Sequence, residues 1–219
     1  ITRDLYDTIR EDYDVWGINN FYIHNFIVPD YLHFEIKADI NGEIFPRFLK
    51  EKFDLYKDVK FIADMATRER DLPYKFLDTE KFKNFYSYRR SDRLNSDGSY
   101  NMSGNYKPHP DYVQITHGKS NSKILDIMAR MNYESIYFCG IDLNNCKYFW
   151  TDNPEYKSVE FPEKMMWCGK GRTLQGVPAE YKKEDNHPSY CLAQFFKEFL
   201  YFNNIECYNL SKDSELRKY

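Results

Sequence analysis

Long hydrophobic runs and a strong charge of one sign are both lacking in this chain. No apolar stretch approaches the roughly 18 residues that span a bilayer, and no secretory leader is visible, so we expect a cytoplasmic protein without a transmembrane segment. A peripheral position at the inner membrane stays open. Net charge is −3 over 219 residues, with acids and bases interspersed. Because a basic footprint for a polyanion is lacking, we expect no nucleic-acid partner.

Cysteine and histidine patterns typical of metal sites are lacking too. The five cysteines contain no C-x-x-C pair and are odd in number. Cys139 and Cys207 fall inside predicted strands, which favours free thiols in a reducing compartment. The five histidines have neither H-x-x-x-H nor H-E-x-x-H spacing. We therefore expect no metal site.

Glycine-rich phosphate motifs are missing as well. Neither G-x-x-x-x-G-K-[ST] nor G-x-G-x-x-G occurs, which argues against a P-loop enzyme or a common dinucleotide enzyme. Aromatic residues are abundant instead, with 20 Tyr and 17 Phe. Their rings could stack on sugars or bases. A codon bias toward Tyr, Phe, Asn, Lys and Ile would also explain their number. Composition alone therefore names no ligand.

Apolar periodicity predicts alternating helices and strands. The predicted helices cover 2–10, 43–58, 124–131 and 190–200, and the predicted strands cover 14–19, 31–35, 59–63, 112–115, 135–142 and 205–210. The strand at 135–142 is almost continuously apolar, which is typical of a central parallel strand covered on both faces. We expect an α/β protein with a doubly wound, mostly parallel Rossmann-like sheet and helices on both faces.

The length suits one Rossmann-like domain over 1–219. Residues 84–111, rich in charged and small polar side chains, are predicted to be a loop-rich insertion. Residues 144–186 are irregular and contain several Pro and Gly. Because loops longer than about 15 residues are usually functional lids or disordered, this segment is predicted to be a lid, part of which folds over a ligand.

Polar residues follow several predicted strands. They are Asn19, Asn20, Glu35, Ser120 and Asp142, the serine opening a helix. Carboxyl ends of parallel strands share one edge of a sheet, so we expect these residues to form a phosphate site beside a helix N-terminus. For any one of them, ordinary capping or turn chemistry is the simpler interpretation.

His187 lies where an extended polar stretch meets the predicted helix at 190–200. Loops on a rigid α/β scaffold carry most of the chemistry, so His187 is our candidate general base. The alternative is a surface histidine that precedes Pro188 at the first position of a helix.

Several segments together carry a family resemblance. They are Val15–Tyr22, Lys119–Ser120 with the helix after it, Tyr133–Asp142, and the segment from His187 to Leu216. These patches resemble the bacterial CMP-sialic-acid-dependent sialyltransferases of lipooligosaccharide synthesis, with Tyr148 near a tyrosine that assists phosphate departure. The first strand and glycine turn of that family would lie upstream of Ile1.

The resemblance implies an inverting, metal-independent glycosyltransferase with a GT-A-like fold. It would move a sialic-acid-like sugar from a CMP-sugar donor to a glycan acceptor hydroxyl without a cofactor, and a homo-oligomer stays open. His187 would take the acceptor proton, and Tyr148 would hydrogen-bond the departing phosphate. The donor-binding residues would be Asn19, Asn20, Glu35, Ser120, Gly140 and Asp142.

Two departures from the family pattern affect this assignment. Asn144 replaces a second tyrosine that the family carries after the strand. Glu35 stands near a donor-contacting Asn of the family, so another CMP-sugar fits as well. Two alternatives remain: a magnesium- and ATP-dependent Rossmann-like enzyme of the hydroxymethylpterin diphosphokinase or flagellin-modifying type, and a non-catalytic nucleotide- or sugar-binding module.

Overall fold

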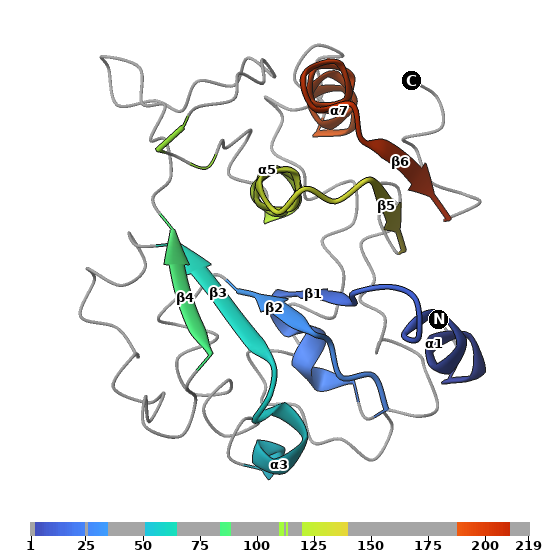
Figure 1. Cartoon of the computed structure of the whole chain (residues 1–219), viewed down its shortest axis with the longest axis vertical. Coiled ribbons are helices and arrows are strands. Elements are labelled where there is room, and N and C mark those ends of the chain that lie inside the picture. Colours follow the sequence, from blue (N-terminus) through green and yellow to red (C-terminus); the bar gives the residue numbers. More distant parts are fainter. Residues whose placement is uncertain are drawn as a thin grey trace, which may run out of the picture. The chain divides into compact units, whose positions relative to one another are not determined.

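The computed structural model describes residues 3–24, 26–34, 51–64, 84–88, 110–111, 113, 120–139 and 188–210. The chain, whose elements are labelled in Figure 1, divides into two compact units, Ile1–Arg90 and Ser91–Tyr219. Both units combine parallel strands with helices, which confirms the expected α/β class. The single domain, the insertion and the lid expected from the sequence stay predictions.

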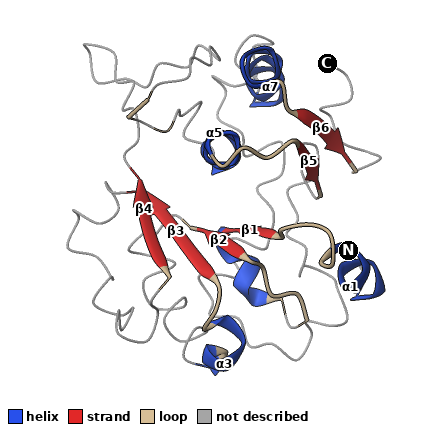
Figure 2. Ribbon diagram, viewed as in Figure 1, coloured by secondary structure: helices blue, strands red, loops and turns tan. Residues whose placement is uncertain are grey.

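The first unit holds a four-stranded sheet in the order β1-β2-β3-β4 (Figure 2). Its strands are β1 (Trp16–Ile18), β2 (Tyr31–His33), β3 (Lys60–Asp64) and β4 (Phe85–Tyr88), and its helical segments are α1 (Arg3–Ile9), η1 (Asn19–Ile23) and α3 (Phe53–Tyr56). Every neighbouring pair of strands is parallel, with Ile18 opposite His33 and His33 opposite Ile62. All four carboxyl ends therefore lie at one edge of the sheet.

One face of this sheet is a closely packed apolar layer. Leu32, Phe61 and Ala63 are fully buried on it. Phe34 packs edge-on against Phe61, with ring centroids 6.3 Å apart, and against Phe85, at 5.9 Å. Successive side chains of a strand point to opposite faces, so these residues share the face opposite His33. The layer fixes the register of β2, β3 and β4.

Sequence analysis did not predict β4, which lies inside the segment 84–111 that was expected to be rich in loops. β4 pairs with β3 in parallel, with Phe61 opposite Phe85 and Asp64 opposite Tyr88. Its two central residues are exposed, because β4 is the outer strand of the described sheet. A four-residue edge strand in a charged sequence lacks the apolar run that marks a buried strand.

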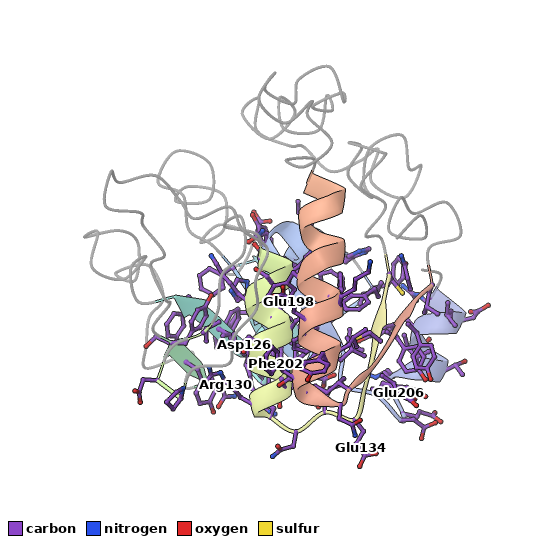
Figure 3. All side chains as sticks on the ribbon, turned by 90° about the horizontal axis from the view of Figure 1, so that it is seen from above. Asp126, Arg130, Glu134, Glu198, Phe202 and Glu206 are labelled. Carbon is purple, nitrogen blue, oxygen red and sulfur yellow. The ribbon has the colours of Figure 1, made fainter. Side chains whose placement is uncertain are left out.

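The second unit contains two helix–strand pairs. They are α5 (Ser120–Arg130) with β5 (Ser135–Phe138) and α7 (Pro188–Asn203) with β6 (Glu206–Asn209). β5 and β6 are parallel, with Ile136 opposite Cys207 and Tyr137 opposite Tyr208. The two helices lie side by side (Figure 3). Phe195 and Phe199 of α7 are fully buried, and their rings stack with centroids 6.0 Å apart.

The expectation that the strand at 135–142 is covered on both faces is wrong for its described part. Ile136 is buried, but Tyr137 is 43% exposed and its opposite neighbour Tyr208 is 42% exposed. The two rings stack on an open face, with centroids 4.9 Å apart. The apolar pattern misled because tyrosine has an aromatic body and a hydroxyl tip that tolerates water.

Other expectations agree with the described elements. The predicted helices at 2–10, 124–131 and 190–200 correspond to α1, α5 and α7, and the strands at 14–19, 31–35, 59–63 and 205–210 correspond to β1, β2, β3 and β6. Cys139 and Cys207 are both free thiols. No helix in the described ranges is long and apolar enough to cross a membrane.

Candidate functional site

The candidate site begins where β1 ends, at the carboxyl edge of the first sheet. Asn19 directly follows β1 and is the first residue of η1, and its φ angle is 51°. Asparagine is one of the few side chains that enter this left-handed region readily. The backbone turns sharply at Asn19. Asn19 lies directly after the end of β1, as the sequence predicted.

The turn folds back onto β1 and requires a glycine there. A Cβ atom at Gly17 would lie 2.6 Å from Cδ1 of Phe21 and 3.0 Å from its Cβ. Real Cβ atoms do not approach so closely, and the Phe21 Cβ cannot move without its backbone. Gly17 therefore allows η1 to lie against β1, which fixes the backbone that follows Asn19.

Lys52 holds the other end of η1. Its ammonium group donates to the backbone oxygens of Tyr22 at 2.8 Å, Ile23 at 3.3 Å and His24 at 2.7 Å. These carbonyls lie at the end of a 3-10 helix, where no further helical N–H group is available to them. Burial lowers the pKa of Lys52 to about 8, against a smaller opposite effect of Glu51. The turn after β1 is thus anchored from a distant part of the sequence.

His24, the residue after η1, is buried beside this anchor. Its ring centroid lies 4.7 Å from that of Phe21 and 5.8 Å from that of Phe26. Burial lowers its pKa to about 4, and nearby positive charge, including that of Lys52, acts in the same direction. His24 is therefore a neutral packing residue at pH 7.

A second polar pair lies at the same edge. His33 is the last residue of β2, and Tyr88 is the last residue of β4. The Nε2 atom of His33 lies 2.7 Å from the Tyr88 hydroxyl oxygen, a hydrogen bond whose direction depends on the histidine tautomer. The rings lie 5.9 Å apart, with 26° between their planes. A buried imidazole and a phenol thus meet at the carboxyl edge.

The amino end of the same sheet carries an aromatic ladder. The rings of Trp16 and Tyr31 stack with centroids 4.3 Å apart and 8° between their planes. The Lys60 ammonium group lies 4.3 Å from the Tyr31 ring centroid and donates to its hydroxyl at 2.9 Å. This hydrogen bond raises the pKa of Lys60. Such cross-strand contacts stabilise pairing of β1, β2 and β3.

In the second unit, Ser120 is the first residue of α5. Only a few residues connect α5 to β5 and α7 to β6, so each helix runs back along the strand that follows it. The amino ends of both helices therefore lie toward the carboxyl ends of β5 and β6. Figure 3 shows the opposite end, where Glu134 and Glu206 mark the starts of the two strands.

The predicted site residues are only partly within the described structure. Asn19 and Asn20 are consecutive residues of η1 in the first unit, and Ser120 begins α5 in the second. The remaining predicted site residues lie outside the described residues: Glu35, Gly140, Asp142, Tyr148 and His187. Their meeting around one donor thus stays a prediction.

Sequence analysis missed the pair of His33 and Tyr88, and it missed Lys52. His33 stands in an apolar strand that the sequence did predict, where a histidine is unusual enough to be a signal. Its partner comes from β4, which was not predicted. The three carbonyls that accept from Lys52 lie 28 to 30 residues away in the sequence. No local sequence pattern predicts a contact between residues so far apart in the sequence.

Comparison with known proteins adds no assignment. Among the described residues, no group of three or more His, Cys, Asp or Glu side chains is placed to hold a metal ion, and the expectation of a metal-independent site stays a prediction. No family model, curated protein or solved structure matches this chain.

Proposed function

We propose that this protein is an inverting, metal-independent glycosyltransferase that moves a sialic-acid-like sugar from a CMP-sugar to an acceptor hydroxyl. The observation that carries the proposal is the position of Asn19. Four parallel strands bring their carboxyl ends to one edge, and Asn19 follows the end of β1 in a sharp turn. In open parallel α/β sheets, ligands bind outside this edge.

The second unit supports the same proposal. Ser120 opens α5, where the first backbone N–H groups of a helix have no partner within the helix. Such a helix start favours a phosphate group. Phe138 ends β5 at the carboxyl edge of this sheet, and Gly140 and Asp142 follow it in the sequence. A helix start and polar residues after a parallel strand are features that suit the phosphate group of a nucleotide donor.

The proposed roles follow from the chemistry of inverting transfer. The imidazole of His187 accepts the acceptor proton as the acceptor oxygen forms its bond to the sugar. The bond between the sugar and the CMP phosphate breaks in the same reaction, and Tyr148 donates a hydrogen bond to the departing phosphate oxygen. Asn19, Asn20 and Ser120 hold the donor, with the further donor-binding residues Glu35, Gly140 and Asp142.

We also propose a more detailed fold and a cellular location for the enzyme. A doubly wound Rossmann-like sheet with residues 144–186 as a lid would give the donor a site closed to water. The enzyme would act in the cytoplasm together with its CMP-sugar donor. It would be a peripheral protein if its acceptor lies at the inner membrane.

The direct test measures CMP release from CMP-sialic acid with an acceptor glycan in the presence of chelator. We expect the wild-type protein to release CMP, and we expect His187→Ala to lower the rate by about 10² to 10⁴-fold, the usual contribution of a general base. His109→Ala is the matched control, because the proposal gives His109 no role. Equal rates for the His187→Ala and His109→Ala proteins would refute His187 as the base.

The same preparation separates the alternatives. Calorimetry against CMP, CDP, UDP and ATP measures which nucleotide binds. Binding of ATP with strict dependence on magnesium, and no binding of CMP, would favour the diphosphokinase type. Binding of CMP without release of CMP from the donor would favour a binding module.

A further inference from the structure

The β5–β6 sheet has one face that packs against α7 and one face that is open. Ile136 is 5% exposed, and Phe138 packs edge-on against Phe196 of α7, with ring centroids 5.1 Å apart. Successive side chains of a strand point to opposite faces, so Tyr137 and its neighbour Tyr208 stand on the other face. They are 43% and 42% exposed. The open face therefore presents two aromatic side chains to solvent.

The Tyr208 ring has one side against Tyr137 and one side directed away from β5. The two rings stack with centroids 4.9 Å apart and 15° between their planes, so Tyr137 covers a single side of the Tyr208 ring. In the described sheet, β5 is the only neighbour of β6. Stacking across strands stabilises a sheet and explains why the two tyrosines are paired. It does not explain why the second side of the Tyr208 ring faces water.

Glu206 adds a carboxylate to this face. It lies two residues before Tyr208 in β6, and its Oε2 atom accepts a hydrogen bond from the Tyr208 hydroxyl at 2.6 Å. This hydrogen bond raises the pKa of Tyr208, so the phenol stays neutral. Glu206 is exposed and uses one oxygen for this bond, so its other oxygen can accept from a ligand. An aromatic surface and a hydrogen-bond acceptor thus lie next to each other.

The charge beside this pair disfavours anions. Glu134 is exposed and precedes β5, and its carbonyl oxygen accepts from the Glu206 N–H group at 3.0 Å. Figure 3 shows Glu134 and Glu206 at the same end of the sheet. Two carboxylates repel a phosphate or a carboxylate. An aromatic cage for a cation needs rings on several sides, whereas the parallel rings of Tyr137 and Tyr208 offer a ligand one side. An uncharged ligand fits this face best.

We propose that Tyr208 and Glu206 bind an uncharged hexopyranose sugar on the open face of the β5–β6 sheet, with Tyr137 as the positioning residue for the Tyr208 ring. A pyranose has a face of C–H groups, which suits the negative face of an aromatic ring. Its hydroxyl groups donate hydrogen bonds to a carboxylate. The site does not rest on the proposed transfer reaction, which gives these three residues no role.

Tyrosine side-chain NMR of the full chain tests the site, with the Tyr208 signals assigned through Tyr208→Phe. The probes are the methyl glycosides of glucose, galactose, mannose and N-acetylglucosamine. We expect at least one of them to shift the Tyr208 signals saturably at millimolar concentration. The methyl glycoside of sialic acid, which is an anion, and choline, which is a cation, should leave these signals in place. No saturable shift with any of the four uncharged glycosides, or larger shifts with either charged probe, would overturn the proposal.

A second copy of the chain is the other occupant that an open sheet face could take. Dilution of the protein in the absence of sugar distinguishes the two, because self-association depends on protein concentration. We expect the Tyr208 signals to stay constant on dilution. Signals that move with protein concentration, together with no effect of the glycosides, would assign the face to self-association and overturn the sugar site.

Variants of Tyr208 test the stacking. Tyr208→Leu retains an apolar side chain without an aromatic face, and it should weaken the affinity for the glycoside, measured on the sugar signals, by about tenfold. Tyr208→Phe retains the ring and should keep most of the affinity. Tyr201→Leu is the matched control, because Tyr201 is 84% exposed and lies in α7, outside the sheet. Equal affinities for Tyr208→Leu and Tyr208→Phe would contradict stacking on the ring.

A variant of Glu206 tests the carboxylate and does not depend on how the sheet tolerates leucine. Glu206→Gln retains the shape and one acceptor oxygen but removes the charge, so the affinity for the uncharged glycoside should fall by roughly 2- to 10-fold. The discrimination against the sialic acid glycoside should decrease at the same time. Glu11→Gln, at an exposed position after α1, is the control. Affinities equal to those of wild type for both glycosides would remove Glu206 from the site.

The outcomes also separate this site from the transferase. Saturable shifts of Tyr208 in a protein that releases no CMP from CMP-sialic acid would retain the sugar site and refute the transferase. Release of CMP by a protein whose Tyr208 signals respond to none of the four uncharged glycosides would refute the sugar site alone.

Discussion

The hydroxyl group of Tyr6 is hydrogen-bonded to both backbone groups of Val28. It donates to the Val28 carbonyl oxygen at 2.6 Å and accepts from the Val28 N–H group at 3.2 Å. Tyr6 lies in α1 and is almost fully buried. One phenol thus replaces the two partners that the backbone of Val28 would find in a sheet, and it ties α1 to the segment that leads into β2.

Replacement of Tyr6 by Phe should lower the free energy of unfolding by about 1–3 kcal/mol, because a backbone donor and a backbone acceptor lose their partner in a largely buried place. Urea unfolding measures the change. Tyr201→Phe is the control, since Tyr201 of α7 is 84% exposed. Equal loss of stability in the two variants would contradict a specific role of the Tyr6 hydroxyl.

Acid should destabilise the first unit through His24. The pKa of His24 is about 4 in the folded protein, whereas the ordinary histidine value of 6.5 applies to the unfolded chain, so the unfolded chain binds more protons between these values. The stability contribution is complete above pH 6.5 and is lost as pH falls toward 4. Urea unfolding at pH 7.5 and 4.5 should show a smaller difference for His24→Gln than for wild type. The same difference in both proteins would contradict this origin.

How far the sequence predicts this fold depends on the range of the contacts. Local apolar periodicity was sufficient for α1, α5 and α7 and for five of the six described strands, all but β4, because their apolar residues recur within a short window. β4 was missed because its pairing with β3 is a long-range contact that leaves its central residues exposed. The open face at Tyr137 was missed for a related reason, since hydrophobicity does not say what covers a strand.

The candidate site, too, was predictable only where it depends on local sequence. The place of Asn19 was predictable, because it requires only the end of a strand. Its left-handed backbone and the anchor from Lys52 were not, since they depend on how η1 packs on Gly17 and on a lysine about 30 residues away. Tertiary contacts decide such details, and no pattern in a short window contains them.

Gly17→Ala should destabilise the protein by about 1–3 kcal/mol, the usual cost of overpacking. The added Cβ would meet Phe21, which must move together with η1. The double variant Gly17→Ala/Phe21→Ala removes the two closest contacts, with Cδ1 and Cγ of Phe21, and keeps only the 3.0 Å approach to its Cβ. The double variant should therefore be more stable than the sum of the two single effects predicts. Strictly additive effects in urea unfolding would contradict this account of the glycine.

In the second unit, Arg130→Met should lower the free energy of unfolding by about 2–3 kcal/mol. The Arg130 guanidinium group donates through Nε and Nη2 to Oδ2 of Asp126, at 3.1 Å each, and through Nη1 to the Pro110 carbonyl at 3.0 Å. The Asp126 side chain is 2% exposed, so loss of its partner leaves a buried charge with fewer hydrogen bonds. Lys197→Met, at an exposed position of α7, is the control and should change stability by less than about 0.5 kcal/mol.

Asn19→Gly tests the donor site with the least disturbance of the backbone. The φ angle of 51° is strained for alanine but ordinary for glycine, so this variant removes the carboxamide and retains the turn. If the carboxamide holds the nucleotide, the affinity for CMP should fall by roughly 2- to 10-fold, the effect of one hydrogen bond. Calorimetry measures the affinity, and thermal unfolding should show little change.

Two further asparagines provide matched controls for this variant. Asn132 has φ 61° and Asn204 has φ 49°, so Asn132→Gly and Asn204→Gly make the same substitution in the same backbone conformation. Neither follows the carboxyl end of a strand, because Asn132 comes after α5 and Asn204 comes after α7. We expect both controls to bind CMP as wild type does. Equal affinity in all three variants would show that the turn after β1 does not hold the donor, and the proposed site would lose the residue that supports it.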